Sequence, residues 1–331
     1  MGGQNVEIEK KIKKAKHIPT LEQVSEICRQ YGIGKLISIM GEIDNSVNSN
    51  LKILTENGTY VIKELSMESS RFDFILSILL DLTNNNIPVL LPLKNQKELY
   101  VIMFDKQAFQ VTKFKYGKHF LHNGHQAWHS GTALRKFHNV LAETPELIKP
   151  KGSIYPSDKI IKTCINKMSI MENEITKDQL SYINDLYDKI VRKWEERSVG
   201  LPQTIIHGDW NQRNQLYSDN GEVCCIMDFD FITRAERLFD VAYSLWRFQI
   251  EEDSIDIMKS FMEGYGALTQ KEIFLLPLAI ARINYFFICS AVLSLNPLLD
   301  FNNNIKQLDP FIQWVLSSNG KCTIRDLCKE N

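Results

Sequence analysis

The sequence predicts an α+β fold of two lobes, with a small β-rich N-lobe and a larger, mainly α-helical C-lobe. Three observations in the 331 residues predict it. Short apolar runs separated by turn residues occupy the chain up to about residue 110, helical apolar spacing dominates the rest, and a single β-type stretch, residues 204–231, interrupts the helical part. Strands followed by helices are typical of an α+β protein. We therefore expect an N-lobe at residues 1–110, an antiparallel sheet plus helix, and a C-lobe at residues 111–331.

The N-lobe is predicted to begin with a helix after Thr20. Thr20 and Gln23 have the spacing of a capping box, in which each side chain bonds the backbone N–H of the other residue. Apolar residues then recur at helical intervals until Gly32, a residue type that commonly ends helices.

Strand-like runs follow at residues 35–40, 51–55 and 60–65, and the last two flank Asn57-Gly58. This dipeptide favours a two-residue type I′ hairpin turn. With that turn Lys63 faces Lys52, and like charges on facing positions oppose pairing. Either the register differs, or a bound phosphate offsets the repulsion.

Further elements complete the prediction. Residues 69–84 read as a helix with one apolar face, and residues 87–92 and 99–104 as strands. The C-lobe is predicted to contain helices at residues 128–141, 158–172 and 177–197.

The most apolar stretch, residues 273–295, is long enough to cross a membrane. It contains Pro277, Arg282 and Asn284, and a charged residue at the middle of a bilayer is costly. We therefore expect a buried helix here and no membrane contact.

Composition indicates a cytoplasmic protein that does not bind nucleic acid. The 39 basic and 40 acidic residues give a net charge of −1, whereas nucleic-acid binders usually carry a basic excess. No apolar signal segment follows Met1. The cysteines number seven and form no C-x-x-C motif, which favours free thiols in a reducing compartment. These features do not predict an oligomeric state.

The candidate functional residues lie in the β-type stretch. Asn220-Gly221 predicts a hairpin turn in which Asn214 faces Met227, so that Asp228 follows at the open end. Asp209 lies on the loop that leads into the same end. Carboxylate and amide oxygens suit Mg²⁺, which commonly bridges to substrate phosphates.

These groups match the requirements of phosphoryl transfer. In that reaction one Asp positions a hydroxyl, an Asn and a second Asp hold the metal ion, and a Lys contacts the phosphates. Asp209 precedes the predicted metal ligands Asn214 and Asp228 and is available to accept a proton. Lys63, at the end of the run Tyr60-Val-Ile-Lys63, is the candidate phosphate contact.

The pattern His207-Gly-Asp209, four residues and Asn214, then Asp228-Phe-Asp230 after a hairpin, resembles the aminoglycoside phosphotransferase/choline kinase superfamily, which has a protein-kinase-like fold. The Tyr60–Lys63 strand and the Leu134-Arg-Lys-Phe-His138 segment add to the likeness, which covers most of the chain in order. Within the superfamily the sequence looks closest to CotS-like spore-coat kinases and to homoserine kinase type II.

The resemblance implies a role for each matching position. Asp209 would be the catalytic base, with His207 and Asp240 supporting its loop, and Asn214 and Asp228 would hold Mg²⁺. ATP, or alternatively GTP, would bind through residues of both the sheet and the connection between lobes, namely Lys63, the polar loop residues Ser46 and Asn48, and Lys113 and Phe114 near the adenine.

The implied function is a Mg²⁺-dependent kinase that transfers the γ-phosphoryl group of ATP to a hydroxyl of a small metabolite or antibiotic. A protein kinase is disfavoured, because no Ala-Pro-Glu follows Asp228 and His-Gly-Asp replaces His-Arg-Asp. The alternative is a catalytically silent kinase-like assembly or spore-coat protein.

Several assignments stay open. Arg213 either reaches the γ-phosphate or faces solvent, and the acidic partner of Lys63 is either Glu68 or Asp73. The acidic run 251–253 either forms a rim for a cationic substrate or begins a helix. By resemblance, the acceptor pocket draws on C-lobe side chains, namely Tyr243, Trp246, Arg247, Arg282, Tyr285 and Phe286.

Overall fold

The structure is a computed structural model, and it describes residues 19–43, 50–65, 69–104, 107–144, 156–171 and 174–329. The described chain forms two compact units. The first comprises residues up to 83 together with 88–117, and the second comprises residues 84–87 together with those from 118 onward. The strand β5 (Gln107–Lys113) runs across the boundary expected after residue 110, and the division follows Gly117.

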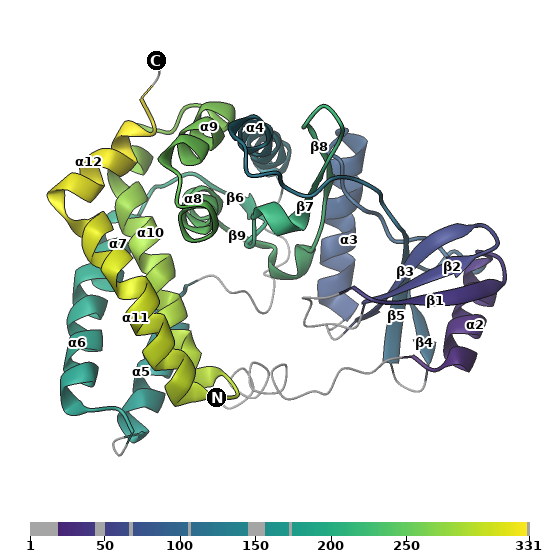
Figure 1. Cartoon of the computed structure of the whole chain (residues 1–331), viewed down its shortest axis with the longest axis horizontal. Helices are drawn as coiled ribbons and strands as arrows, with labels where there is room; N and C mark the ends of the chain where they lie inside the picture. Colours follow the sequence, from purple (N-terminus) through teal and green to yellow (C-terminus); the bar gives the residue numbers. More distant parts are fainter. Residues whose placement is uncertain are drawn as a thin grey trace. The chain divides into compact units, whose positions relative to one another are not determined.

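The first unit is built on a five-stranded antiparallel sheet in the order β1-β2-β3-β5-β4 (Figure 1). Besides β5, the helices and strands of this part of the chain are α2 (Leu21–Tyr31), β1 (Leu36–Glu42), β2 (Asn50–Thr55), β3 (Gly58–Leu65), α3 (Ser69–Asn84) and β4 (Ile102–Phe104).

Helix α2 covers one face of this sheet (Figure 1). The predicted capping box is present, with Thr20 N–H bonded to Gln23 Oε1 at 2.9 Å and Gln23 N–H bonded to Thr20 Oγ1 at 3.2 Å. Gly32 ends the helix in the left-handed conformation, at φ 65°. Side chains alternate between the two faces of a strand. Ile62 is buried in the α2 cluster, so Lys63 lies on the opposite face of the central strand β3.

The β2–β3 hairpin has a different register from the predicted one. Thr55 pairs with Gly58, so Glu56 and Asn57 form the turn and Lys63 faces Asn50. A type I′ turn needs positive φ at both central residues, whereas here Gly58 has the positive φ, at 131°, and Asn57 does not. The predicted turn at 57–58 is therefore wrong, and Lys63 does not face Lys52.

Residues 87–92 do not form the predicted strand. Pro92 makes only an isolated bridge to Thr112. Pro88 and Pro92 have no N–H to donate to a ladder, which keeps proline out of central strands. The strand predicted at 99–104 is shortened to β4.

The second unit is mainly helical, and two short two-stranded sheets, β6-β9 and β7-β8, interrupt it. Its strands are β6 (Gln203–Ile206), β7 (Gln215–Tyr217), β8 (Val223–Ile226) and β9 (Thr233–Glu236). Its helices are α4 (Gly124–Leu141), α5 (Asp158–Ile170), α6 (Lys177–Tyr187), η1 (Asp188–Arg192), α7 (Lys193–Arg197), η2 (Gln212–Asn214), η3 (Phe229–Phe231), α8 (Leu238–Glu252), α9 (Ile255–Tyr265), α10 (Gln270–Ser290), η4 (Ala291–Leu293), α11 (Pro297–Leu316) and α12 (Ser318–Asp326).

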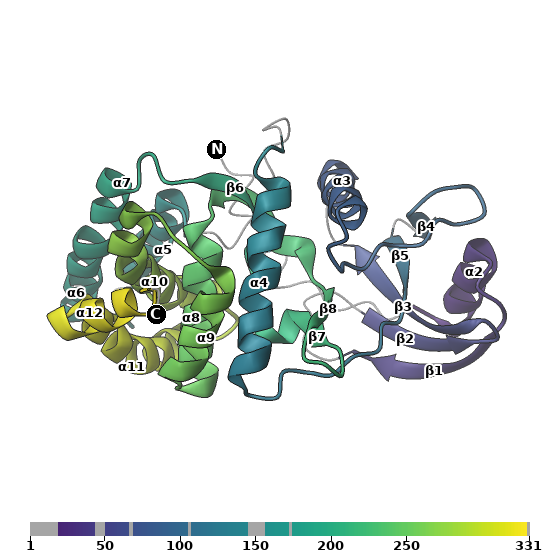
Figure 2. The same cartoon turned by 90° about the horizontal axis from the view of Figure 1, so that it is seen from above.

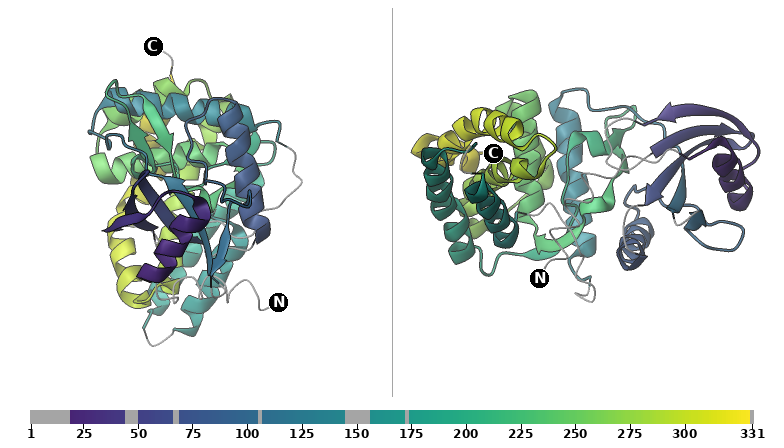
Figure 3. Two further views of the ribbon diagram at one scale, coloured as in Figure 1. Left: turned by 90° about the vertical axis from the view of Figure 1, so that its right-hand side faces the viewer. Right: turned by 90° about the horizontal axis from the view of Figure 1, so that it is seen from below.

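Helix α10 lies at the centre of the second unit, with α11 and α8 packed against it (Figure 3). Residues 270–293 form the one helical stretch of the described chain that is long and apolar enough to cross a membrane, and 78% of its most apolar window is buried in the protein. Inside it, Asn284 Oδ1 accepts a hydrogen bond from Trp246 Nε1 at 2.9 Å, and Arg282 Cζ lies 4.8 Å from the centre of the Trp194 ring. The predicted buried helix is confirmed.

The chain enters the second unit through a backbone clamp. Lys118 N–H bonds Tyr217 O and Tyr217 N–H bonds Lys118 O, both at 2.8 Å. Tyr217 is fully buried in β7. The first residue after the division is thus fixed to the hairpin that follows the candidate site.

Helices α4 and α9 lie side by side and approach closely (Figure 2). Glycine makes this possible, because a Cβ on Gly131 would lie 2.1 Å from Phe261 O, and one on Gly264 would lie 1.9 Å from Trp128 O. Neither backbone group can move aside as a flexible side chain would.

Gly131→Ala is therefore expected to destabilise the protein by about 1–3 kcal/mol, the usual cost of overpacking, although alanine favours a helix. Urea denaturation measures this change. Lys136→Ala, at an exposed position of the same helix, is the control and should change stability by less than about 0.5 kcal/mol. Equal stability of the two variants would show that α4 and α9 can separate at no cost.

Candidate functional site

The candidate site lies in the second unit, on the loop 207–214 and the β7–β8 hairpin that follows it. Strands β6 and β9 form one two-stranded sheet and β7 and β8 form another, so the loop leaves the first sheet and enters the β7–β8 hairpin. At the open end of this hairpin Gln215 pairs with Ile226, and Met227 N–H bonds Asn214 O at 2.9 Å. The prediction that Asn214 faces Met227 is confirmed.

The turn of the β7–β8 hairpin differs from the predicted two-residue turn. Ser218 bonds both Gly221 and Glu222, so the turn spans residues 219–221 instead of two residues. A register shift between Leu216 and Tyr217 compensates for the extra turn residue. The open end is therefore in the expected register because two irregularities cancel.

The carboxylate of Asp240, at the start of α8, holds the beginning of the loop. Its Oδ2 accepts the His207 N–H at 2.8 Å and its Oδ1 accepts the Gly208 N–H at 2.9 Å. His138 Nε2 lies 3.1 Å from Oδ2. Asp240 is fully buried, and a buried carboxylate is tolerated where donors satisfy its oxygens.

Gly208 must be glycine for two reasons. Its φ of 80° is strained for other residues. A Cβ at this position would also lie 2.5 Å from Phe231 O.

His207 joins the loop 207–214 to the end of the β7–β8 hairpin. Its Nε2 lies 3.0 Å from Met227 O, and its Nδ1 accepts the Asp209 N–H at 3.3 Å. This pattern assigns the proton to Nε2. The fully buried ring therefore fixes Asp209 relative to the residue that precedes Asp228.

Asp209 is held by three side-chain donors. Its Oδ1 accepts Asn211 Nδ2 at 2.8 Å and the Tyr243 hydroxyl at 2.6 Å, and its Oδ2 accepts Asn214 Nδ2 at 2.8 Å. Burial, together with the negative charge of Asp209, raises the pKa of Tyr243, so the phenol stays a donor. A carboxylate offers about four lone-pair positions, which leaves one on Oδ2.

Asn214 and Asp228 present the donor set of a hard cation. Both hydrogen bonds from Asn214 Nδ2 go to Asp209, which orients the amide oxygen away from that carboxylate. Asp228 follows β8 in the left-handed conformation, at φ 63° and ψ 71°, a backbone state that is costly for a non-glycine residue and often marks functional sites. An amide oxygen and a carboxylate fit Mg²⁺.

The described residues that are predicted to contact the nucleotide, Lys63, Lys113 and Phe114, all lie in the first unit. Lys63 is half-buried on β3 and faces Gln110 of β5. Lys113 ends β5 and is exposed, and the ring of Phe114 lies 4.9 Å from that of Tyr116 and below Lys52 Nζ. Ser46 and Asn48 lie outside the described residues, as does Glu68, one candidate partner of Lys63.

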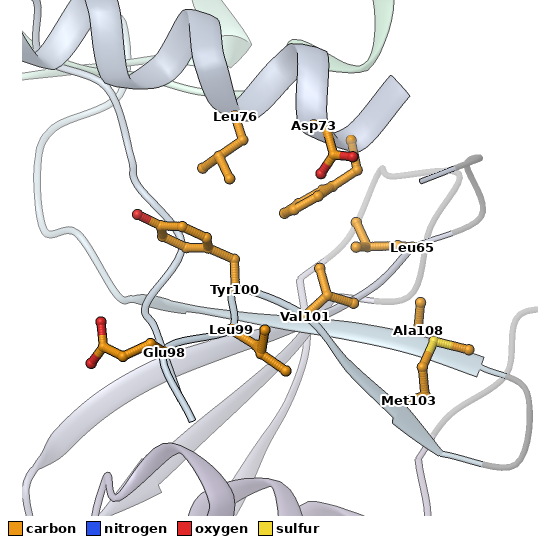
Figure 4. A pocket seen from close by; sticks show the side chains of 10 residues that line it. Leu65, Asp73, Leu76, Glu98, Leu99, Tyr100, Val101, Met103 and Ala108 are labelled. Atoms are coloured by element: carbon orange, nitrogen blue, oxygen red, sulfur yellow. The ribbon is translucent and has the colours of Figure 1, made fainter. Parts of the chain in front are cut away.

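Asp73, the other candidate partner, lies on a pocket of the first unit between α3 and the strands β4 and β5 (Figure 4). The pocket has a volume of about 510 Å³. Leu76, Tyr100 and Val101 line it, whereas Lys63, Lys113 and Phe114 are not among its lining residues.

The side chains that the resemblance assigns to an acceptor pocket have different surroundings, and among them the rings of Tyr243 and Trp246 lie 5.3 Å apart. Tyr285, Phe286 and Arg282 are buried, and the Tyr285 hydroxyl donates to Ile183 O at 2.9 Å. Tyr243 contacts Asp209 directly. Arg213, left open, forms an exposed ion pair with Glu251 at 2.9 Å.

Two contributors were not identified from the sequence. Asn211 lies two residues after Asp209 in a stretch with no periodic signal. His138 binds Asp240 from α4, and only tertiary structure brings them together. Tyr243 was named from the sequence as an acceptor-pocket residue, and its hydrogen bond to Asp209 was not predicted.

Three comparisons describe what the chain is similar to. A family model described as "Phosphotransferase enzyme family" matches residues 43–273. A homoserine kinase of Neisseria meningitidis is 24% identical over 242 residues, which cover 71% of this chain and 75% of that protein.

Among solved structures, a microcompartment-associated aminopropanol kinase superposes with a TM-score of 0.70 at 13% identity, covering 91% of this chain and 99% of the other. An amicoumacin kinase in complex with AMP-PNP, Ca²⁺ and Ami gives a TM-score of 0.64 at 14% identity, covering 97% and 96%. These likenesses confirm the two-lobed α+β fold.

His138 is expected to make stability depend on pH. Burial lowers its pKa, against the opposing hydrogen bond and charge of Asp240. The unfolded chain therefore takes up a proton near pH 6.5 while the folded protein does not, so stability should fall as the pH drops below about 6.5, by at most about 1.4 kcal/mol per pH unit.

His138→Gln should flatten this dependence between about pH 6.5 and 5, as measured by urea denaturation at each pH. His119→Gln, at an exposed position, is the control and should keep the wild-type slope. An unchanged slope in His138→Gln would mean that another group titrates.

Proposed function

Because the chain belongs to the phosphotransferase enzyme family, and is thus an ATP-dependent phosphotransferase acting on a hydroxyl of a small molecule, we propose that Asp209 is its catalytic base and that Asn214 and Asp228 hold Mg²⁺. The proposal is supported chiefly by one observation, the Asp209 carboxylate held by Asn214 and Tyr243. The curated relatives are homoserine kinases, so small amino alcohols and hydroxy amino acids are the first acceptors to test.

In this mechanism the acceptor hydroxyl donates to the remaining lone pair of Asp209 Oδ2. Asp209 takes the proton as the hydroxyl oxygen attacks the γ-phosphorus and the bond to the ADP oxygen breaks. Asn211, Asn214 and Tyr243 keep the carboxylate oriented throughout, and a correctly positioned general base raises the rate of the transfer. Mg²⁺ supplies charge neutralisation on the phosphates when bound.

Nucleotide binding is proposed for the residues named from the sequence. Lys63 would contact the α- and β-phosphates, with Ser46 and Asn48 over the phosphates and Lys113 and Phe114 near the adenine. ATP is the proposed donor, with GTP as the alternative.

We also propose a cytoplasmic location, since no disulfide joins the seven cysteines. The partner is a small-molecule acceptor, and neither nucleic acid nor membrane is part of the proposal.

The function is tested by screening hydroxyl-bearing metabolites and antibiotics for ADP release. On the best acceptor, Asp209→Asn should lower kcat by about 10²–10⁴, the usual contribution of a general base. Asp219→Asn, at the exposed hairpin tip, is the matched control and should keep wild-type turnover. Undiminished turnover in Asp209→Asn would reject the assigned base, and no ADP release with any acceptor would favour the silent spore-coat alternative.

Lys63→Met is expected to weaken nucleotide binding. A ligand that binds only the folded state raises its stability, so wild-type protein should show a higher Tm with ATP and Mg²⁺, and the variant a much smaller rise. Lys35→Met, exposed in the same unit, should respond as the wild type does. The assignment of Lys63 fails if both variants gain the same shift.

A further inference from the structure

A charged cluster joins the candidate site to the C-terminal half of α8. Glu251 accepts hydrogen bonds from Gln212 and Arg247, and it forms an ion pair with Arg213 at 2.9 Å. Two guanidinium groups share one carboxylate, so these three charged side chains carry a net charge of +1. The excess charge is not matched within the cluster.

Arg247 has unused hydrogen-bonding capacity. Its side chain is only 19% exposed, and Nη2 bonds Glu251. Its Nε is buried and has no hydrogen-bond partner among the described residues. Arg247 Cζ also lies 5.6 Å from the centre of the Trp246 ring, a contact that uses no N–H donor. A guanidinium has five N–H donors, and a largely buried cation with unused donors favours an anionic ligand.

Arg247 lies one helical turn after the α8 residue that bonds the proposed base. Tyr243, whose hydroxyl bonds Asp209 Oδ1, precedes Arg247 by four residues on α8. Residues at this spacing share a helical face and are separated by about 6 Å along the axis. The charge of Arg247 acts on the Tyr243 hydroxyl, where it opposes the rise of the pKa of Tyr243.

We propose that Arg247 binds a carboxylate on the acceptor, so that the substrates are small hydroxy acids, including hydroxy amino acids. This inference rests on the proposed function, because the hydroxyl must lie at Asp209 while the carboxylate reaches Arg247. A planar guanidinium recognises a carboxylate well.

Two other ligand groups are compared with a carboxylate at this position, an amine and a nucleotide phosphate. Glu251 is occupied by three donors and has no capacity left for a substrate amine. Glu252 Oε2 contacts His122 at 2.5 Å, whereas Glu252 Oε1 is buried without a hydrogen-bond partner among the described residues and could accept one. The acidic run ends α8 instead of beginning a helix, and the side chains of Glu251 and Glu252 are mostly buried, so neither an exposed acidic rim nor a first helical turn is formed by these two residues.

A nucleotide phosphate is the second alternative ligand. Asn214, the proposed metal ligand, bonds Asp209 Oδ2, whereas Tyr243, one turn before Arg247 on α8, bonds Oδ1. Because Arg247 also shares Glu251 with Arg213, which directly precedes Asn214, the test below measures acceptor binding and nucleotide binding separately.

The test compares alcohols that differ only by a carboxylate. The pairs are L-homoserine with 3-amino-1-propanol, L-serine with ethanolamine, and L-threonine with 1-amino-2-propanol. Binding to the full chain is measured by calorimetry with AMP-PNP and Mg²⁺ present, so that no turnover is needed. In at least one pair the carboxylate should bind tighter by about tenfold or more, since a hydrogen bond between charged groups contributes such a factor.

Arg247→Gln should bring that ratio close to one, and Arg247→Lys should restore part of it. Arg192→Gln is the control, because Arg192 is exposed and pairs with Asp188 at the next helical turn; it should keep the wild-type ratio. Circular dichroism and Tm confirm that each variant folds.

The proposal is overturned if neither member of any pair binds, if the pairs bind equally to wild type, or if the preference survives Arg247→Gln. Weaker AMP-PNP binding by Arg247→Gln with an unchanged acceptor ratio would instead assign Arg247 to the nucleotide. A carboxylate preference without ADP release would leave this inference standing and would count against the proposed function alone.

Discussion

The candidate site depends on one buried carboxylate. Asp240 accepts the N–H groups of His207 and Gly208, and His138 from α4 contacts the same oxygen as His207. Each oxygen is thereby satisfied without water, which is what makes a fully buried charge tolerable. The loop, α8 and α4 meet at this group, so Asp240 fixes the direction in which the chain enters residues 209–214. The hydrogen bonds within residues 209–214 then orient the individual side chains.

The two-lobed α+β fold and most helices could be predicted because periodicity and caps are local signals. Thr20 with Gln23, and the helix at 69–84, are examples. The errors arise where the outcome depends on details that the pattern does not encode. The turn after β2 uses Glu56 and Asn57, with Thr55 Oγ1 accepting the Asn57 N–H at 3.2 Å, and this side-chain contact competes with the dipeptide preference.

The part of the candidate site that could be predicted is the part built from residues close together in sequence. Asn214 and Asp228 are joined by one hairpin, and Asp209 by a short loop, so spacing alone brings them to one end. Tyr243, His138 and Arg247 reach the site from α8 and α4, and no local pattern states which face of a helix will meet a loop. The register of the hairpin itself was predicted correctly although its turn was not, because a shift at Leu216 offsets the longer turn.

The clamp between Lys118 and Tyr217 has a mechanical consequence. Two backbone hydrogen bonds join Lys118 to Tyr217 of β7, the strand that immediately follows Asn214. A movement of the segment before Lys118 is therefore resisted by the buried backbone of Tyr217 and is not transmitted to the loop 207–214. Any pivot in the segment leading to Lys118 is confined to residues before it. The geometry around Asp209 is in this way insulated from bending of the segment that immediately precedes Lys118.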